Sequence, residues 1–156
     1  MKYVIDTNIL INLIIYLPIE HHPTFWKWLE RQIKEGHIII LDVVAEECKH
    51  GNIKKWVYGA AVKRYIVNTD DLMTSAAEIE KEYKLITKEE DIIKSKADPI
   101  IIAYAQKNSG VGVFTQERKK KPGETQNKIP DVCEALGVPY DRWPEKVWKV
   151  LHFKKI

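Results

Sequence analysis

The sequence is poor in cysteine. Its 156 residues contain only two, Cys48 and Cys133. Two thiols cannot build a disulfide framework, and a chain of this length can bury a sufficient core without one. We therefore expect two buried, reduced thiols and a reducing, cytoplasmic setting.

A long hydrophobic run is also lacking. The apolar stretch near the N-terminus, from Ile9 to Leu17, is too short to cross a bilayer, which takes about 20 apolar residues. Asp6, Asn8 and Asn12 lie in or beside this stretch, and no A-x-A cleavage pattern follows it, so it does not resemble a signal peptide. We interpret the stretch as part of the core and expect no membrane partner.

The sequence has no large charge excess, internal repeat, linker or low-complexity segment. It contains 25 Lys and Arg against 22 Asp and Glu, and a net charge of +3 indicates an anionic partner only weakly. Basic and aromatic residues are not interleaved, so no base-stacking platform is predicted. With 45% hydrophobic residues, the chain is expected to form one domain, residues 1–156, with residues 138–156 as a C-terminal helical extension.

The most informative stretch is Tyr3–Leu10. Apolar residues run into Asp6-Thr7-Asn8 and then continue, which predicts a short buried strand that turns directly into a helix. In an open parallel sheet, ligand sites form outside the carboxyl ends of the strands. Asp6 and Asn8 are therefore expected at that edge of the sheet.

Two further apolar strands are predicted, Ile38–Leu41 and Val111–Thr115. Continuous apolar strands are typical of a parallel sheet that helices cover on both faces. Periodicity and stop signals predict helices over residues 9–16, 24–35, 43–49, 54–65, 72–83, 100–106, 131–136 and 144–153. This alternation predicts an α/β protein with a three-layer αβα fold and a central, mainly parallel sheet.

Capping signals set several of these helix boundaries. Asp42 and Asp98, the latter followed by Pro99, are predicted N-caps. Gly51 is predicted to end the helix that follows Asp42, and residues 87–90 are predicted to form a capping box.

Three acidic residues are predicted to lie at the carboxyl edge of the sheet. Asp6 follows the first strand, Glu117 follows the Val111–Thr115 strand, and Asp98 heads a helix that is apolar on nearly all sides. One such residue would be an ordinary cap or a surface acid, but three at one edge indicate a common site.

A fourth acid is predicted from the helix over residues 43–49. Residues three or four apart lie on one helical face, so Glu47 shares a face with the apolar Val44, whereas Glu46 shares one with Asp42 and Lys49. We therefore expect Glu46 to be solvated and Glu47 to point inward.

Carboxylates that converge in this way are costly unless a cation neutralises them. Oxygen ligands suit Mg²⁺ or Mn²⁺, which activate water and stabilise the oxygens of an in-line phosphoryl displacement. The expected chemistry is metal-dependent hydrolysis of a phosphodiester. The predicted catalytic metal ligands are Asp6, Glu47, Asp98 and Glu117.

Polar and basic residues beside the acids are expected to support this chemistry. Asn8 is placed to hold Asp6 or a metal-bound water, and Thr115 is placed to do the same for Glu117. The loop after Glu117 is basic, and next to the acids it would neutralise RNA backbone phosphates. The predicted RNA-binding residues are Arg118, Lys119, Lys120 and Lys121.

These residues resemble the PIN-domain superfamily of metal-dependent nucleases. The resemblance covers about residues 2–137. Its matching segments are Val4–Asn8, Val44–Glu47, Ala97–Pro99 with Ile102-Ala103, and Phe114–Glu117. Lys128–Cys133 looks like a branch of PIN proteins near the VapC-type toxins.

The resemblance implies a Mg²⁺- or Mn²⁺-dependent ribonuclease, often the toxin of a toxin–antitoxin pair, with a cognate antitoxin as partner, and often a homodimer. Asp6, Glu47, Asp98 and Glu117 match the family's acidic quartet. The family commonly has Asp at the last of these positions, and Glu117 is one methylene longer. Asp131 is placed to complete the site instead.

Other functions fit the sequence less well. A haloacid-dehalogenase-like phosphatase needs a second aspartate where this chain has Asn8, and a receiver domain needs an acidic pair at the first strand. The spacing of Cys48, His50 and Cys133 is not that of a usual zinc site. A catalytically inactive PIN-like module that binds RNA or protein remains the main alternative.

Overall fold

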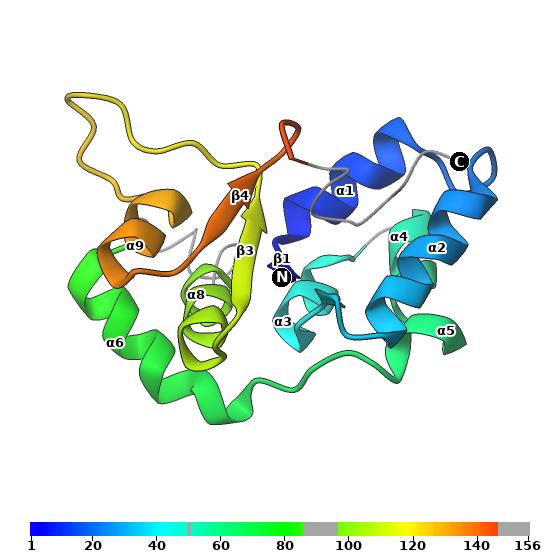
Figure 1. Cartoon of the computed structure of the whole chain (residues 1–156), viewed down its shortest axis with the longest axis horizontal. Helices are drawn as coiled ribbons and strands as arrows, with labels where there is room; N and C mark the ends of the chain where they lie inside the picture. Colours follow the sequence, from blue (N-terminus) through cyan, green and yellow to red (C-terminus); the bar gives the residue numbers. More distant parts are fainter. Residues whose placement is uncertain (50, 86–96, 147–156) are drawn as a thin grey trace.

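The computed structural model describes residues 1–49, 51–85 and 97–146 and shows a four-stranded, all-parallel sheet. The strand order is β2-β1-β3-β4. Helices flank this sheet (Figure 1), so the predicted α/β, three-layer arrangement is confirmed. The strands are β1 (Lys2–Ile5), β2 (Ile38–Ile39), β3 (Val111–Thr115) and β4 (Tyr140–Arg142).

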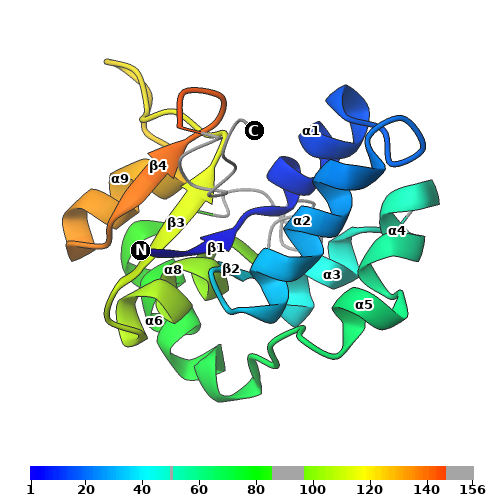
Figure 2. The same ribbon diagram turned by 45° about the vertical axis from the view of Figure 1, so that its right-hand side comes forward.

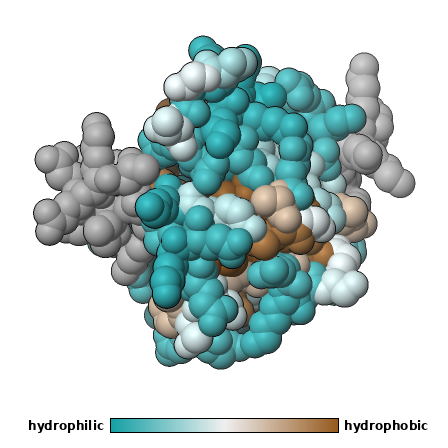
Figure 3. All heavy atoms as spheres, turned by 90° about the vertical axis from the view of Figure 1, so that its left-hand side faces the viewer, coloured by the Kyte–Doolittle hydropathy of each residue, from teal (hydrophilic) through white to brown (hydrophobic). Residues whose placement is uncertain are grey.

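The helices divide between the two faces of the sheet. Figure 2 shows α6, α8 and α9 on one side and α1, α2, α4 and α5 on the other. On the side of α6 and α9, hydrophilic surface surrounds a central hydrophobic area (Figure 3). No helix among the described residues is long and apolar enough to cross a membrane. The helices are α1 (Thr7–Tyr16), α2 (Pro23–Lys34), α3 (Asp42–Glu47), α4 (Gly51–Val57), α5 (Ala60–Lys63), η1 (Asp70–Leu72), α6 (Met73–Tyr83), α8 (Ala97–Lys107) and α9 (Ile129–Leu136).

The two central strands, β1 and β3, continue in opposite directions across the sheet. The chain leaves β1 through α1 and α2 to reach β2, and it leaves β3 through α9 to reach β4. Right-handed crossovers in opposite directions place their helices on opposite faces. The carboxyl ends of β1 and β3 therefore form a topological switch point, where ligand sites of parallel sheets are found.

The central strands are buried on both faces. The side chains of Val4, Ile5, Val113 and Phe114 are fully buried, as continuous apolar strands require. Gly112 lets the ring of Tyr3 lie against β3, because a Cβ at this position would be 3.0 Å from that ring. This core fixes where the two strands end, and so fixes the edge at which Asp6 and Glu117 emerge.

Strand β4 corrects the prediction that residues 138–156 form a helical extension. Its residues pair with β3 in parallel, with Tyr140 opposite Val113 and Arg142 opposite Thr115. The Tyr3 hydroxyl donates to the Asp141 carboxylate and ties this edge strand to β1. A three-residue, half-buried strand has too little hydrophobic periodicity to be predicted. The predicted helix over residues 144–153 lies outside the described residues from 147 onwards.

The helix predicted over residues 54–65 is interrupted. The chain instead forms α4 and α5, which meet at Gly59, where a Cβ would be 3.1 Å from the Lys55 carbonyl oxygen. Gly51 does not end the preceding helix but begins α4, with φ of 58°. Gly59 is extended, and its Cβ position lies close to the carbonyl oxygens of the preceding turn, a local backbone break that helical periodicity does not reveal.

The predicted N-cap Asp42 also has a different role. The N-cap of α3 is Leu41, and Asp42 lies inside the helix. Its carboxylate accepts the Thr69 hydroxyl at 2.6 Å, which fixes the loop before η1 to α3. The strand predicted up to Leu41 ends at Ile39, although Leu41 forms a parallel bridge with Val67. The capping box predicted over residues 87–90 lies outside the described residues.

Candidate active site

Asp6 lies at the switch point, directly after β1. Ile5 pairs with Phe114, so Asp6 is opposite Thr115, the last residue of β3. The Thr115 hydroxyl donates to Asp6 Oδ2 at 3.1 Å. Asp6 occupies the N-cap position of α1, but its carboxylate makes no capping hydrogen bond of standard geometry. The neighbouring strand, more than the following helix, therefore holds this carboxylate.

The environment of Asp6 disfavours its charge. Only 4% of the residue is exposed. Burial, and then the negative charge of Glu117, raise the pKa of Asp6 from 3.8 to about 6. The Thr115 hydroxyl and the backbone amides of Thr7 and Asn8 act in the opposite direction and lower the pKa. Asn8 thus acts on Asp6 through its backbone amide, in the first turn of α1.

Asp98 lies in the first turn of α8. The helix begins at Ala97, one residue before the predicted N-cap. Burial raises the pKa of Asp98 well above its usual value, and the next causes are the charges of Asp6, Glu117, Glu47 and Glu80. Among the described residues, every charged group that shifts this pKa is acidic. The four predicted acids therefore act on one another across four separate elements.

Glu47 is the last residue of α3. It is half-buried while Glu46 is exposed, which confirms the predicted helical phase. The Thr7 hydroxyl donates to Glu47 Oε1 at 3.2 Å. Thr7 and Thr115, from α1 and β3, thus each fix one carboxylate of the acidic group.

Glu117 is held from three directions. Its backbone N–H donates to the Thr115 hydroxyl at 3.1 Å, and its backbone carbonyl accepts from Arg142 Nε at 3.0 Å. Its carboxylate oxygen Oε2 accepts the backbone N–H of Ile129, at the start of α9, at 2.9 Å. The prediction that Thr115 holds the Glu117 side chain is wrong, because Thr115 holds the Glu117 backbone and the Asp6 side chain.

Asp131 serves the basic loop in the structure. Its Oδ2 accepts the backbone N–H of Lys128 at 2.9 Å and that of Lys120 at 3.1 Å. Asp131 closes the loop and caps α9, and it is not among the charges that raise the pKa of Asp6 or Asp98. The side chain that joins the acidic group at this side is Glu117.

The basic loop follows Glu117 in the sequence and runs from the end of β3 to α9 (Figure 1). The four predicted RNA-binding residues are all exposed. Lys119 forms a 2.6 Å ion pair with Glu134, and Lys120 Nζ donates to Asn127 at 3.0 Å. Arg118 and Lys121 carry the remaining positive charge of this predicted segment.

Two residues at the site were not predicted. Glu80, from α6, has a buried carboxylate oxygen and contributes to the raised pKa of Asp98. It lies four residues after the buried Ala76 and next to the buried Ile79, a spacing that marks the inward face of a helix. Arg142, at the end of the unpredicted β4, adds a cation beside Glu117.

A family model described as Domain of unknown function (DUF4411) matches residues 3–144. The chain belongs to this family. The match includes strands β2, β3 and β4, all but the first residue of β1, and every acid of the site. No curated protein and no solved structure matches the chain.

The donor atoms of the acidic group are all carboxylate oxygens, which suit a hard divalent cation such as Mg²⁺ or Mn²⁺. Within the described part of the chain, no three His, Cys, Asp or Glu side chains are already grouped as metal ligands. The two cysteines are free and buried, and burial raises the pKa of each thiol to about 12. This confirms the prediction of buried thiols.

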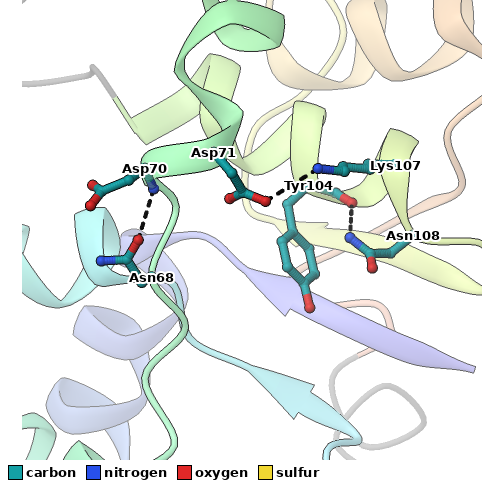
Figure 4. A network of polar contacts seen from close by, with 6 residues as sticks. All are labelled: Asn68, Asp70, Asp71, Tyr104, Lys107 and Asn108. Atoms are coloured by element: carbon teal, nitrogen blue, oxygen red, sulfur yellow. Dashed lines mark hydrogen bonds and ion pairs between the residues drawn. The ribbon is translucent and has the colours of Figure 1, made fainter.

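The amino edge of the sheet has a different character. A pocket of about 870 Å³ opens there, and none of the described residues that line it is acidic. Its basic lining residues are Lys2, Lys34, His37 and Lys107. Lys107 forms a 3.2 Å ion pair with Asp71 (Figure 4), and both side chains are more than half exposed.

Proposed function

We propose that the protein is a Mg²⁺- or Mn²⁺-dependent endoribonuclease that hydrolyses RNA phosphodiester bonds at the carboxyl edge of its sheet. One observation carries this proposal. Asp98 is half-buried near the topological switch point, where the negative charges of Asp6, Glu117 and Glu47 help to raise its pKa. Buried like charges raise the free energy of the fold, and their placement at the switch point favours a functional reason for them.

A divalent cation fits this group of residues. The buried Asp6 and the half-buried Glu47, Asp98 and Glu117 would hold it. When bound, such a cation activates water and neutralises the charge that develops on the phosphate oxygens. Two observations support this assignment. All the donor atoms are oxygens, and no basic group is among the causes that shift the pKa of Asp98.

The chain's own residues position the ligands and the substrate in this proposal. Thr115 orients Asp6, and Thr7 orients Glu47, through the hydrogen bonds described above. Arg142 and the basic loop offset the repulsion between the acids and RNA phosphates. Arg142 is the better fixed of these cations, because its guanidinium is bonded to the Glu117 carbonyl and its side chain is only 21% exposed.

The resemblance to PIN-domain nucleases suggests a cellular role and protein partners for the proposed ribonuclease. We propose that the protein is the toxin of a toxin–antitoxin-type pair in the cytoplasm, with a cognate antitoxin protein and a second copy of the chain as partners. The sequence segments that carry the resemblance include Asp6, Glu47, Asp98 and Glu117, the residues that act together in the structure. Co-purification with the product of a neighbouring gene would test the antitoxin.

RNA cleavage by the purified protein tests the nuclease proposal. We expect cleavage of single-stranded RNA with Mg²⁺ or Mn²⁺, products with 5′-phosphate and 3′-hydroxyl ends, and no cleavage in EDTA. Asp6→Asn should abolish activity. Glu47→Gln and Glu46→Gln form a matched pair on one helix, and only the first should be inactive. Activity that survives both EDTA and Asp6→Asn contradicts the proposal.

A binding module is the second candidate, and one contact favours it. The Glu117 carboxylate already accepts the N–H of Ile129, so this side chain also has a purely structural use. Calorimetric titration with Mn²⁺ separates the two functions. Binding of Mn²⁺ to the wild type and its loss in Asp6→Asn support the nuclease, and RNA binding without any Mn²⁺ binding supports the module.

A further inference from the structure

The carboxyl edge carries an aromatic pair that sequence periodicity does not reveal. The rings of Tyr16 and Trp143 are stacked, with centroids 6.3 Å apart and an angle of 20° between their planes. Tyr16 ends α1, and Trp143 directly follows β4. Tyr16 is 67% exposed, whereas Trp143 packs against the core. A supported indole with an exposed ring beside it is a surface on which flat ligands can stack.

Backbone hydrogen bonds connect this pair to the acidic site. The N–H of Trp143 donates to the carbonyl of Thr115 at 2.9 Å, and the side chain of Thr115 holds Asp6. The residue before Trp143 is Arg142, which donates to the Glu117 carbonyl. The aromatic pair and the acids are thus built on the ends of the same strands.

One face of α1 runs from the acids to the aromatic pair. Asn8, Asn12 and Tyr16 are spaced four residues apart and so lie on one side of the helix. The amide of Asn12 donates to the Gln116 side chain at 2.6 Å, which shows that this side faces the segment after β3. At about 1.5 Å per residue, the 10 residues of α1 span about 15 Å. This is the length of about four stacked nucleotides at about 3.4 Å each.

We propose that Tyr16 and Trp143 form a nucleobase-stacking subsite for single-stranded RNA, a few nucleotides from the bond that is cut. The proposal rests on the proposed nuclease function for the position of the cut, but not for the binding itself. Amide side chains and Arg142 along the way offer donors to phosphate oxygens, while the rings offer stacking to any base. The subsite predicts tight binding of unpaired RNA with little preference among bases.

The test uses the full-length chain with Asp6→Asn, which should bind RNA without cutting it. Affinity for a short fluorescein-labelled single-stranded oligoribonucleotide is measured by fluorescence anisotropy. Adding Tyr16→Ala should weaken binding roughly 5- to 100-fold, the range that loss of one stacked base gives, and Tyr16→Phe should stay within about twofold. Tyr58→Ala is the matched control, because Tyr58 is an exposed tyrosine in another part of the chain, just after α4.

A series of oligoribonucleotides with one abasic position each locates the stacked base. One position should weaken binding to the Tyr16 protein, and the same position should have no effect once Tyr16 is alanine, because the two changes remove one interaction. Trp143→Ala should weaken RNA binding as Tyr16→Ala does. If circular dichroism shows that Trp143→Ala disrupts the fold, the abasic series with the exposed Tyr16 still tests the stacking subsite.

The outcomes separate this proposal from the nuclease proposal. If wild type cuts RNA but Tyr16→Ala binds it as tightly as its parent does, the stacking subsite is wrong and the nuclease stands. If wild type does not cut RNA but the abasic cycle holds, the nuclease is wrong and the subsite stands. If Tyr16→Ala changes the oligomeric mass and leaves RNA affinity unchanged, the surface binds protein, and the stacking proposal is overturned.

Discussion

The two edges of the parallel sheet differ in how they arrange charge. At the carboxyl edge, Asp6 is buried and Asp98 half-buried near other acids, and hydroxyl and amide groups hold the carboxylates in place. At the amino edge, basic residues line a pocket, and the ion pair of Lys107 with Asp71 is exposed. Exposed pairs of this kind contribute little to stability. Among the described residues, the charges whose arrangement costs the fold stability lie at the carboxyl edge.

Helix α8 joins both edges and shows the contrast in one element. Its first turn carries Asp98 and its last turn carries Lys107. Both placements agree with the helix dipole, which favours an acid at the start and a base at the end. The dipole and the exposed ion pair with Asp71 account for Lys107. The dipole does not explain why the half-buried Asp98 lies near other carboxylates, so the carboxyl edge is the one to test.

Substituting one acid at each edge should give the largest contrast. Asp98→Asn should lower RNA cleavage by more than about a hundredfold, because changes to residues that merely support metal ligands already cost 10- to 100-fold. Asp71→Asn, at the amino edge, should leave cleavage unchanged. Initial rates at saturating Mn²⁺ measure both. Equal losses in the two variants would show that the edges do not differ in function.

Thr115 should matter less than the acids, but more than a surface residue. Thr115→Val keeps the shape of the side chain and removes the hydrogen bonds to Asp6 and to the Glu117 backbone. We expect Mn²⁺ affinity and cleavage to fall about 10- to 100-fold, as for other residues that orient metal ligands. Thr74→Val, at an exposed site on α6, is the control. Unchanged Mn²⁺ affinity in Thr115→Val would remove Thr115 from the site.

The pH dependence of stability should distinguish the edges without any RNA. In EDTA, the folded protein binds a proton at Asp6 up to about pH 6, while the unfolded chain releases it near 3.8. Stability therefore falls as the pH rises from about 4 to about 6, by up to about 3 kcal/mol from this residue. Asp98 contributes in the same direction, because its pKa is also raised.

Urea unfolding below and above this pH window measures the effect. Asp6→Asn should become more stable than wild type as the pH rises, whereas Asp71→Asn should follow the wild-type profile. Mn²⁺ should stabilise wild type above the window and have little effect on Asp6→Asn. A wild-type profile in Asp6→Asn would mean that burial of this carboxylate costs nothing.

The smallest expected effect concerns the basic residues at the two edges. Arg118→Ala or Lys121→Ala should reduce the salt dependence of single-stranded RNA binding by a slope of about 0.7 for each phosphate that the variant no longer neutralises. Lys2→Ala and Lys34→Ala, at the amino edge, should not change the slope. Anisotropy titrations over a range of salt concentrations give these slopes. A change only in the amino-edge variants would place RNA on the other side of the sheet.

The parts of the site that were predictable depend on local periodicity. The strand before Asp6 and the helical phase that separates Glu47 from Glu46 follow from residue spacing alone, and the structure agrees. Glu80 carried the same type of signal, since it follows the buried Ile79, but its neighbours in sequence are mostly charged. Local periodicity therefore locates strand ends and helix faces, but it does not tell which of several inward-facing acids belong to the site.

The parts that were not predictable depend on contacts between distant segments. Arg142 reaches the site because β4 adds to the sheet edge, and a strand of three residues gives no clear signal. Tyr16 meets Trp143 for the same reason. The roles of Asp42 and Asp131 were also missed, since each carboxylate is used to fasten a loop. Such polar contacts are decided by loop paths, which the sequence pattern does not encode.

The hydroxyl of Thr115 determines which hydrogen bond the Asp6 carboxylate receives from β3. A hydroxyl carries one proton. Because its oxygen accepts the N–H of Glu117, that proton is free to point at Oδ2 of Asp6. A divalent cation bound at the proposed site would compete with a proton for the Asp6 carboxylate, so mild acidification should release the cation as a chelator does.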